Sequence, residues 1–130
     1  MDNYIVLDLE WNQCPRGREY SKEGLPFEII EFGAIKLDAE FKAVDKFHRV
    51  VKPQVYKQMH FRVHEVVQMG IEELKKNGIP FNRAIKEFFE FCEMDNSEKK
   101  KIICTWGELD LLELQRNIKY FKAENKFDYP

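Results

Sequence analysis

The stretch Ile5-Val6-Leu7-Asp8-Leu9-Glu10 decides the fold at the start of this chain. Its apolar residues predict a buried strand over residues 1–10. Side chains two apart on a strand point to the same face, so Asp8 and Glu10 place two carboxylates side by side at its end. Like charges this close repel, and burying them unpaired is costly. A divalent cation such as Mg²⁺ or Mn²⁺ would balance them. Simple solvation of two surface acids is the alternative.

Composition indicates a single domain over residues 1–130, with 44% hydrophobic residues, 34% charged residues and a net charge of −2. No stretch approaches the roughly 20 apolar residues of a membrane span, and no signal peptide is expected. Three widely spaced cysteines suit a reducing compartment and not a disulfide framework, so we expect a cytoplasmic protein. Nucleic-acid binders are often basic, but bound cations can supply the positive charge of a site that handles phosphates.

Three more strands are expected, separated by turn residues. They cover residues 27–37, 42–52 and 101–104, with a long polar loop over 11–26. The turn at 38–40 is so short that the strands it joins should be antiparallel.

Helical spacing of apolar residues appears in three segments. These are 60–76, interrupted near Gly70 and stopped at Gly78, then 80–94, and 108–122. Thr105 to Glu108 fits a capping box before the last helix. The element order predicts an α/β fold whose mixed sheet has three antiparallel strands and one parallel strand, with helices packed on it.

A third carboxylate belongs to the same edge of this sheet. Asp110 lies in the first turn of the helix that follows the 101–104 strand. Functional sites of such sheets lie beyond the carboxyl ends of parallel strands. If the first and fourth strands are parallel neighbours, Asp8, Glu10 and Asp110 converge. The alternative is that Asp110 only favours the start of its helix electrostatically.

Several motifs together resemble the DEDD exonuclease superfamily, in order along nearly the whole chain. Val6 to Trp11 resembles its first motif, Asp-x-Glu, and Glu28 to Ala34 resembles its second strand. Thr105-Trp106-Gly107-Glu108-Leu109-Asp110 resembles its second acidic motif, in the Trp-Gly form of the branch that contains the histone-mRNA exonuclease. Residues 70–81 resemble the segment before the next helix.

The resemblance implies a ribonuclease H-like fold and a 3′–5′ exonuclease acting on single-stranded RNA or DNA 3′ ends. It implies two Mg²⁺ or Mn²⁺ ions, with Asp8, Glu10 and Asp110 as catalytic ligands and Asp8 as the bridge between the ions. Trp11, Asn12 and Trp106 adjoin these acids and are expected to contact substrate. Packing of Trp11 over the sheet edge is the alternative.

One departure concerns the third motif of the family, His-x-x-x-x-Asp on a final helix. The residues five positions after His48, His60 and His64 are Pro53, Glu65 and Met69, so the motif is missing. We therefore expect a chain truncated before its final strand and helix, inactive alone if nothing supplies them. An inactive nucleic-acid-binding or interaction module on the same fold is the alternative, and another two-metal nuclease or phosphatase is a third.

Overall fold

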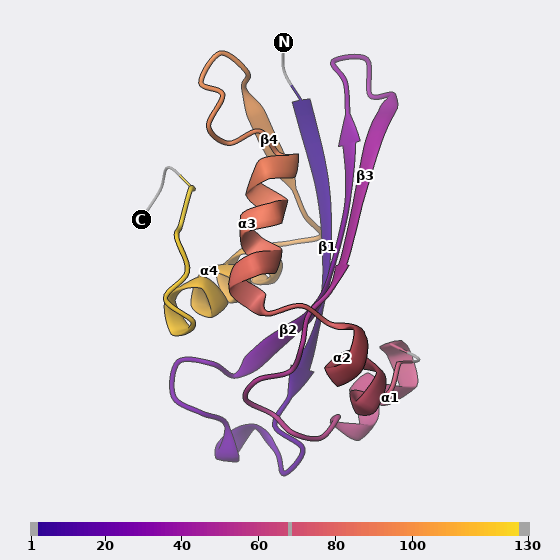
Figure 1. Ribbon diagram of the computed structural model, residues 1–130, viewed down its shortest axis with the longest axis vertical. Coiled ribbons are helices and arrows are strands. Elements are labelled where there is room, and N and C mark those ends of the chain that lie inside the picture. Colours follow the sequence, from indigo (N-terminus) through magenta and orange to yellow (C-terminus); the bar gives the residue numbers. More distant parts are fainter. Residues whose placement is uncertain (1–2, 68, 128–130) are drawn as a thin grey trace.

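A four-stranded mixed sheet forms the centre of the computed structural model, which describes residues 3–67 and 69–127 (Figure 1). The strands are β1 (Asn3–Gln13), β2 (Phe27–Leu37), β3 (Ala43–Val50) and β4 (Lys101–Cys104). Their order is β3-β2-β1-β4, with β2 antiparallel to both of its neighbours and β4 parallel to β1. The predicted α/β fold with three antiparallel strands and one parallel strand is confirmed.

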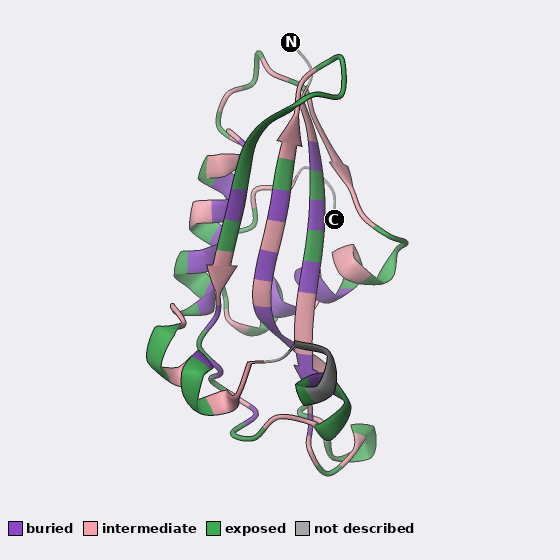
Figure 2. Ribbon diagram, turned by 90° about the vertical axis from the view of Figure 1, so that its right-hand side faces the viewer, coloured by how far each residue is buried: buried purple, intermediate pink, exposed green. Residues whose placement is uncertain are grey.

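Four helices complete the fold: α1 (Phe61–Val67), α2 (Ile71–Asn77), α3 (Phe81–Phe91) and α4 (Leu109–Tyr120). The two longer helices, α3 and α4, lie against one face of the sheet, and α1 and α2 lie near its lower end (Figure 1). Turning the molecule brings the opposite face of the strands into view (Figure 2). In the described part of the chain most of that face is left uncovered by helices, and we call it the open face.

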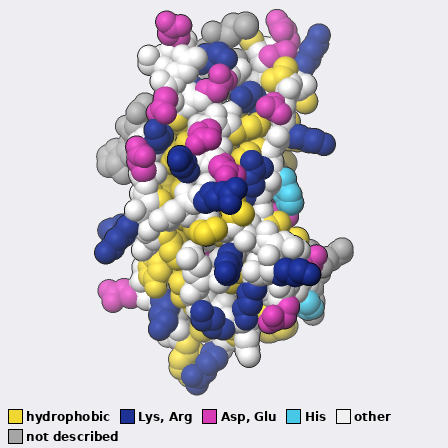
Figure 3. Space-filling view, in the orientation of Figure 1, with side chains coloured by type: hydrophobic (Ala, Val, Ile, Leu, Met, Phe, Trp, Pro, Cys, Tyr) yellow, Lys and Arg dark blue, Asp and Glu magenta, His cyan; other side chains and the backbone are white. Residues whose placement is uncertain are grey.

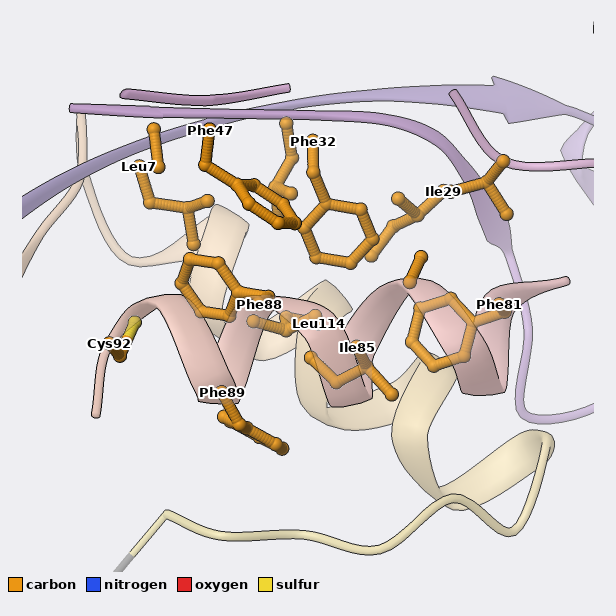
Figure 4. Close-up of a cluster of buried hydrophobic side chains, with 14 of the residues drawn as sticks. Leu7, Ile29, Phe32, Phe47, Phe81, Ile85, Phe88, Phe89, Cys92 and Leu114 are labelled. Atoms are coloured by element: carbon orange, nitrogen blue, oxygen red, sulfur yellow. The ribbon is translucent and has the colours of Figure 1, made fainter. Parts of the chain in front are cut away.

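The hydrophobic core lies between the sheet and α3. Ile5, Leu7 and Leu9 alternate along β1 with exposed Val6 and Asp8, so one side of the strand is apolar. Figure 4 shows the phenylalanines of the sheet pointing at those of the helix. The ring centroids of Phe32 and Phe47 each lie 5.8 Å from that of Phe88. The Phe-rich helix α3 is therefore part of the core. Burying each of these rings contributes about 1.5–3 kcal/mol to stability.

β1 is longer than predicted. It continues past Glu10 to Gln13, because residues 11–13 pair with the start of β2 after a bulge between Glu10 and Trp11. The acid pair therefore lies within the strand and not at its end. β4, in contrast, stops opposite Val6, so Asp8 and Glu10 do lie beyond the carboxyl end of this parallel neighbour.

The predictions at two helix ends have different outcomes: the capping box before α4 is wrong, and the stop of α2 at Gly78 is confirmed. Thr105 does not cap α4: its hydroxyl donates to the Gly107 carbonyl at 2.6 Å, and the left-handed φ of Gly107 (+103°) delays the helix to Leu109. Gly78 follows α2 but with φ −75°. A side chain there would lie 2.5 Å from the backbone of Leu74 and Lys52, so close approach of the chain explains this glycine.

Candidate active site

Asp8 and Glu10 lie on the open face of β1, as the alternation of the strand requires. Asp8 is exposed and Glu10 is half-buried. Backbone N–H groups point to alternate sides along a strand, so the N–H of Leu9 points to the same side of β1 as that of Asn3. The Asn3 N–H donates to the Lys100 carbonyl beside β4. At Leu9 the neighbouring strand β4 has already ended. A free strand edge thus borders the acid pair.

Asp110 fills this edge from the first turn of α4. The backbone N–H of Leu9 lies near enough to this carboxylate to lower its pKa. Burial and then the negative charge of Asp8 raise the pKa of Asp110, while the Leu9 N–H lowers it, and the net direction is upward. The structure therefore brings the three predicted carboxylates together.

The pKa of Glu10 is also raised. Burial is the largest cause, followed by the charges of Asp8, Glu31 and Asp110. Four carboxylates thus share one region of the open face. We call Asp8, Glu10, Glu31 and Asp110 the acid cluster.

Glu31 is a member of the cluster that sequence reasoning missed. It lies directly opposite Glu10 in the β1–β2 pairing, and its Oε2 is 2.6 Å from Nε2 of His48 on β3. Gly33 separates His48 from Asp8 across the sheet and contributes no side chain there. The loop between β1 and β2 is too long for its sequence to predict which residues of the two strands lie opposite each other. No local signal therefore identified the pairing of Glu10 with Glu31.

The three aromatic and amide residues predicted to contact substrate differ in their surroundings. Trp106, between β4 and α4, is 90% exposed. Trp11 is half-buried, packs against the core, and has its ring centroid 5.5 Å from that of Phe27. Asn12 is fully buried, with its amide donating to the Gln58 carbonyl and accepting from the His60 N–H. Asn12 therefore holds the segment around Gln58 and His60 against β1.

The donor set of the cluster suits hard cations, because carboxylate oxygens are the ligands that Mg²⁺ and Mn²⁺ prefer. Within residues 3–67 and 69–127, no three His, Cys, Asp or Glu side chains are already arranged closely enough to hold an ion. Burial is the largest cause of the raised pKa of Glu10 and of Asp110, and the charges of neighbouring carboxylates add to it. A cation bound there would offset that added repulsion. The residues present therefore fit a metal site by chemistry and charge.

No helix among the described residues is long and apolar enough to cross a membrane. The three cysteines are free thiols.

The known proteins that this chain resembles are exonucleases. Residues 5–129 match the RNase_T family, described as exonuclease. The chain is 26% identical over 116 residues to the probable 3′-5′ exonuclease KapD of Bacillus subtilis strain 168, covering 89% of this chain and 53% of KapD. The chain thus spans about half the length of this curated relative.

Solved structures share the fold at lower identity. The nuclease domain of 3′hExo, a DEDDh family member bound to rAMP, superposes with a TM-score of 0.75 at 18% identity, over 95% of this chain and 61% of that one. Cell-death related nuclease 4 superposes with a TM-score of 0.76 at 17% identity, over 96% of this chain and 42% of that one. E. coli exonuclease I in complex with a dT13 oligonucleotide superposes with a TM-score of 0.73 at 16% identity, over 98% of this chain and 25% of that one.

These structures confirm the predicted ribonuclease H-like fold. The family match covers residues 5–129, which is nearly the whole chain. The chain belongs to the RNase_T exonuclease family.

Proposed function

We propose that this chain forms the nuclease part of a metal-dependent enzyme that releases nucleotides from single-stranded RNA or DNA 3′ ends. The observation that carries the proposal is the convergence of Asp8, Glu10 and Asp110 on one open edge of β1. Family membership makes hydrolysis of phosphodiester bonds the reaction to test first.

We propose Asp8, Glu10 and Asp110 as ligands of two Mg²⁺ or Mn²⁺ ions, with Asp8 shared between them. When bound, such a pair activates water and stabilises the leaving 3′ oxygen. The chain itself contributes positioning: β1 fixes the spacing of Asp8 and Glu10, and the Leu9 N–H lies beside the Asp110 carboxylate. Glu31 adds negative charge beside Glu10 and so strengthens the demand for cations.

The proposed substrate contacts differ according to how exposed Trp106, Trp11 and Asn12 are. Trp106 lies four residues before Asp110 and offers its ring to solvent, so we propose that it stacks on a base of the bound strand. Trp11 has only part of its ring available, and we propose a secondary contact for it. For Asn12 the proposed role becomes indirect, through the segment that it holds.

A second candidate function is nucleic-acid binding without cleavage. Within these 130 residues Asp110 is not followed by the His-x-x-x-x-Asp motif that the family resemblance associates with the general base. Under this alternative the fold and the surface for the strand remain, and only the chemistry is lost. The three free cysteines suit a reducing compartment, and we propose the cytoplasm for either function.

The test is the fate of a 5′-labelled single strand incubated with the chain and Mn²⁺. Stepwise shortening that stops at a blocked 3′ end, and that Asp110→Asn abolishes, would support the exonuclease. Asp45→Asn is the matched control, because Asp45 is exposed on β3 away from the cluster. Binding of the strand without shortening would support the second function. Shortening that survives Asp110→Asn would overturn the assignment of the site.

A further inference from the structure

A short cationic and aromatic segment lies beside the acid cluster. Residues 57–62 read Lys-Gln-Met-His-Phe-Arg and contain no acidic residue, although the whole chain has a net charge of −2. They include the last residues of the connection between β3 and α1 and the first two residues of α1. We call residues 57–62 the stacking segment.

The buried side chain of Asn12 fixes the stacking segment to β1. Its Nδ2 donates to the Gln58 carbonyl at 3.0 Å, and its Oδ1 accepts from the His60 N–H at 2.9 Å. Asn12 lies two residues beyond Glu10, which is about 7 Å along a strand. The segment is therefore held next to the acid cluster.

The chain before this segment is equally constrained. Glu28, 1% exposed, accepts hydrogen bonds from the N–H groups of Gln54, Val55 and Tyr56 at 2.8 to 3.0 Å. Each of these bonds crosses from β2 to the loop that enters the stacking segment. The surface of residues 57–62 is thus largely organised before any ligand binds, which lowers the cost of binding.

Phe61 presents an aromatic ring to solvent within this segment. It is 63% exposed, whereas Phe32, Phe81, Phe88 and Phe89 are all buried. The His60 ring stacks on it with centroids 4.8 Å apart, and the guanidinium of Arg62 lies 5.6 Å from its centre. Exposed rings flanked by cations are the surface that stacks on bases of single strands.

The two cations of the segment are exposed. Among the side chains that the structure describes, Lys57 and Arg62 have no carboxylate within ion-pair distance. Lys and Arg side chains gather over the lower end of the molecule in Figure 3, and α1 lies at this end in Figure 1. Phosphates repelled by the acid cluster would be attracted here.

We propose that the stacking segment binds the part of a single-stranded nucleic acid that lies upstream of its 3′-terminal nucleotide. Phe61 stacks on a base, and Lys57 and Arg62 pair with phosphates. This inference rests on the proposed function, because it places the strand whose 3′ end occupies the acid cluster. It also gives buried Asn12 a role in substrate binding through the segment it holds.

The test is binding of 5′-labelled single strands measured by fluorescence anisotropy. One probe has about 12 nucleotides, within the ~4–16 that single-strand sites cover, and the other is a dinucleotide. Ca²⁺ replaces Mn²⁺ to balance the carboxylates, and gels check that the probe stays intact. Phe61→Ala should weaken the longer probe roughly 5- to 100-fold and leave the dinucleotide unchanged. Lys57→Gln with Arg62→Gln should reduce the slope of log K against log salt by about 1.4.

Matched controls lie at the other end of the sheet. Phe41 is 65% exposed and lies in the turn between β2 and β3, so Phe41→Ala removes an equally exposed ring. Lys42→Gln with Lys46→Gln makes the same change in net charge. Both controls should bind the longer probe as the unaltered chain does.

Two outcomes separate the inference from the function beneath it. If the unaltered chain binds the longer probe and the stacking-segment variants bind it equally well, the segment is not a binding surface and the proposed function stands. If the unaltered chain binds neither probe, the proposed function is overturned together with this inference.

Discussion

Replacing Glu10 by Gln should stabilise the fold at neutral pH when no divalent cation is present. Glu10 and Asp8 are two apart on a strand, so their carboxylates lie about 7 Å apart. Two unit charges at this distance repel by about 0.6 kcal/mol in water and ~2.4 kcal/mol at an effective dielectric constant of 20. Glu10 is only half-buried and salt screens it, so we expect a gain of about 0.5–1 kcal/mol.

The pH dependence of this gain follows from the raised pKa of Glu10. When the pKa of a carboxyl is higher in the folded than in the unfolded protein, protonation of that carboxyl stabilises the folded state. Its contribution is therefore present below the ordinary value of 4.5 and is lost as the pH rises through the folded pKa. Glu10→Gln should match the unaltered chain at pH 4 and exceed its stability at pH 7.5.

Thermal unfolding followed by circular dichroism in EDTA measures the difference, which should be about 2–4 °C in Tm at pH 7.5. Glu40→Gln is the matched control, because Glu40 is exposed in the turn between β2 and β3. It removes one negative charge away from the cluster and should leave Tm unchanged. An equal Tm for Glu10→Gln and the unaltered chain at both pH values would refute the reasoning about clustered charge.

Three further predictions concern the scaffold. Glu28→Ala removes a buried carboxylate and leaves three N–H groups, one of them buried, without their acceptor; it should cost about 3 kcal/mol in urea unfolding, and Glu28→Gln, which keeps one acceptor oxygen, should cost less. Phe88→Ala empties a fully buried position and should cost about 3–5 kcal/mol in the same assay; a loss under 1 kcal/mol would place Phe88 outside the core. Burial raises the pKa of Cys92 to about 12, so a thiol reagent followed by mass spectrometry should modify half-buried Cys104 well before Cys92; equal rates would mean that the core opens readily.

Much of the sheet could be predicted from local sequence. The bounds of β2 and β4 agree with the prediction because both runs are dense in β-forming residues and end at turns or polar residues. The end of β1 could not be predicted in the same way. Its last residues pair with Phe27 to Ile29 across a long loop and a bulge, and neither feature leaves a local pattern.

Part of the candidate site could be predicted because the regular geometry of a single strand or helix fixes where its side chains point. Alternation placed Asp8 and Glu10 on one face, and the start of a helix placed Asp110 near them. Glu31 was missed because its position opposite Glu10 depends on the register between strands. The hydrogen bonds of Asn12 could not be predicted because its partners, Gln58 and His60, lie more than forty residues away in sequence.

The central claim is that Asp8, Glu10 and Asp110 form a divalent-cation site. Titration of the metal-free chain with Mn²⁺ in a calorimeter tests it most directly, with Asp8→Asn as the variant and Asp45→Asn as the control. The account predicts saturable binding by the unaltered chain and by Asp45→Asn, and loss of that binding in Asp8→Asn. Unchanged affinity in Asp8→Asn would contradict the assignment of the site.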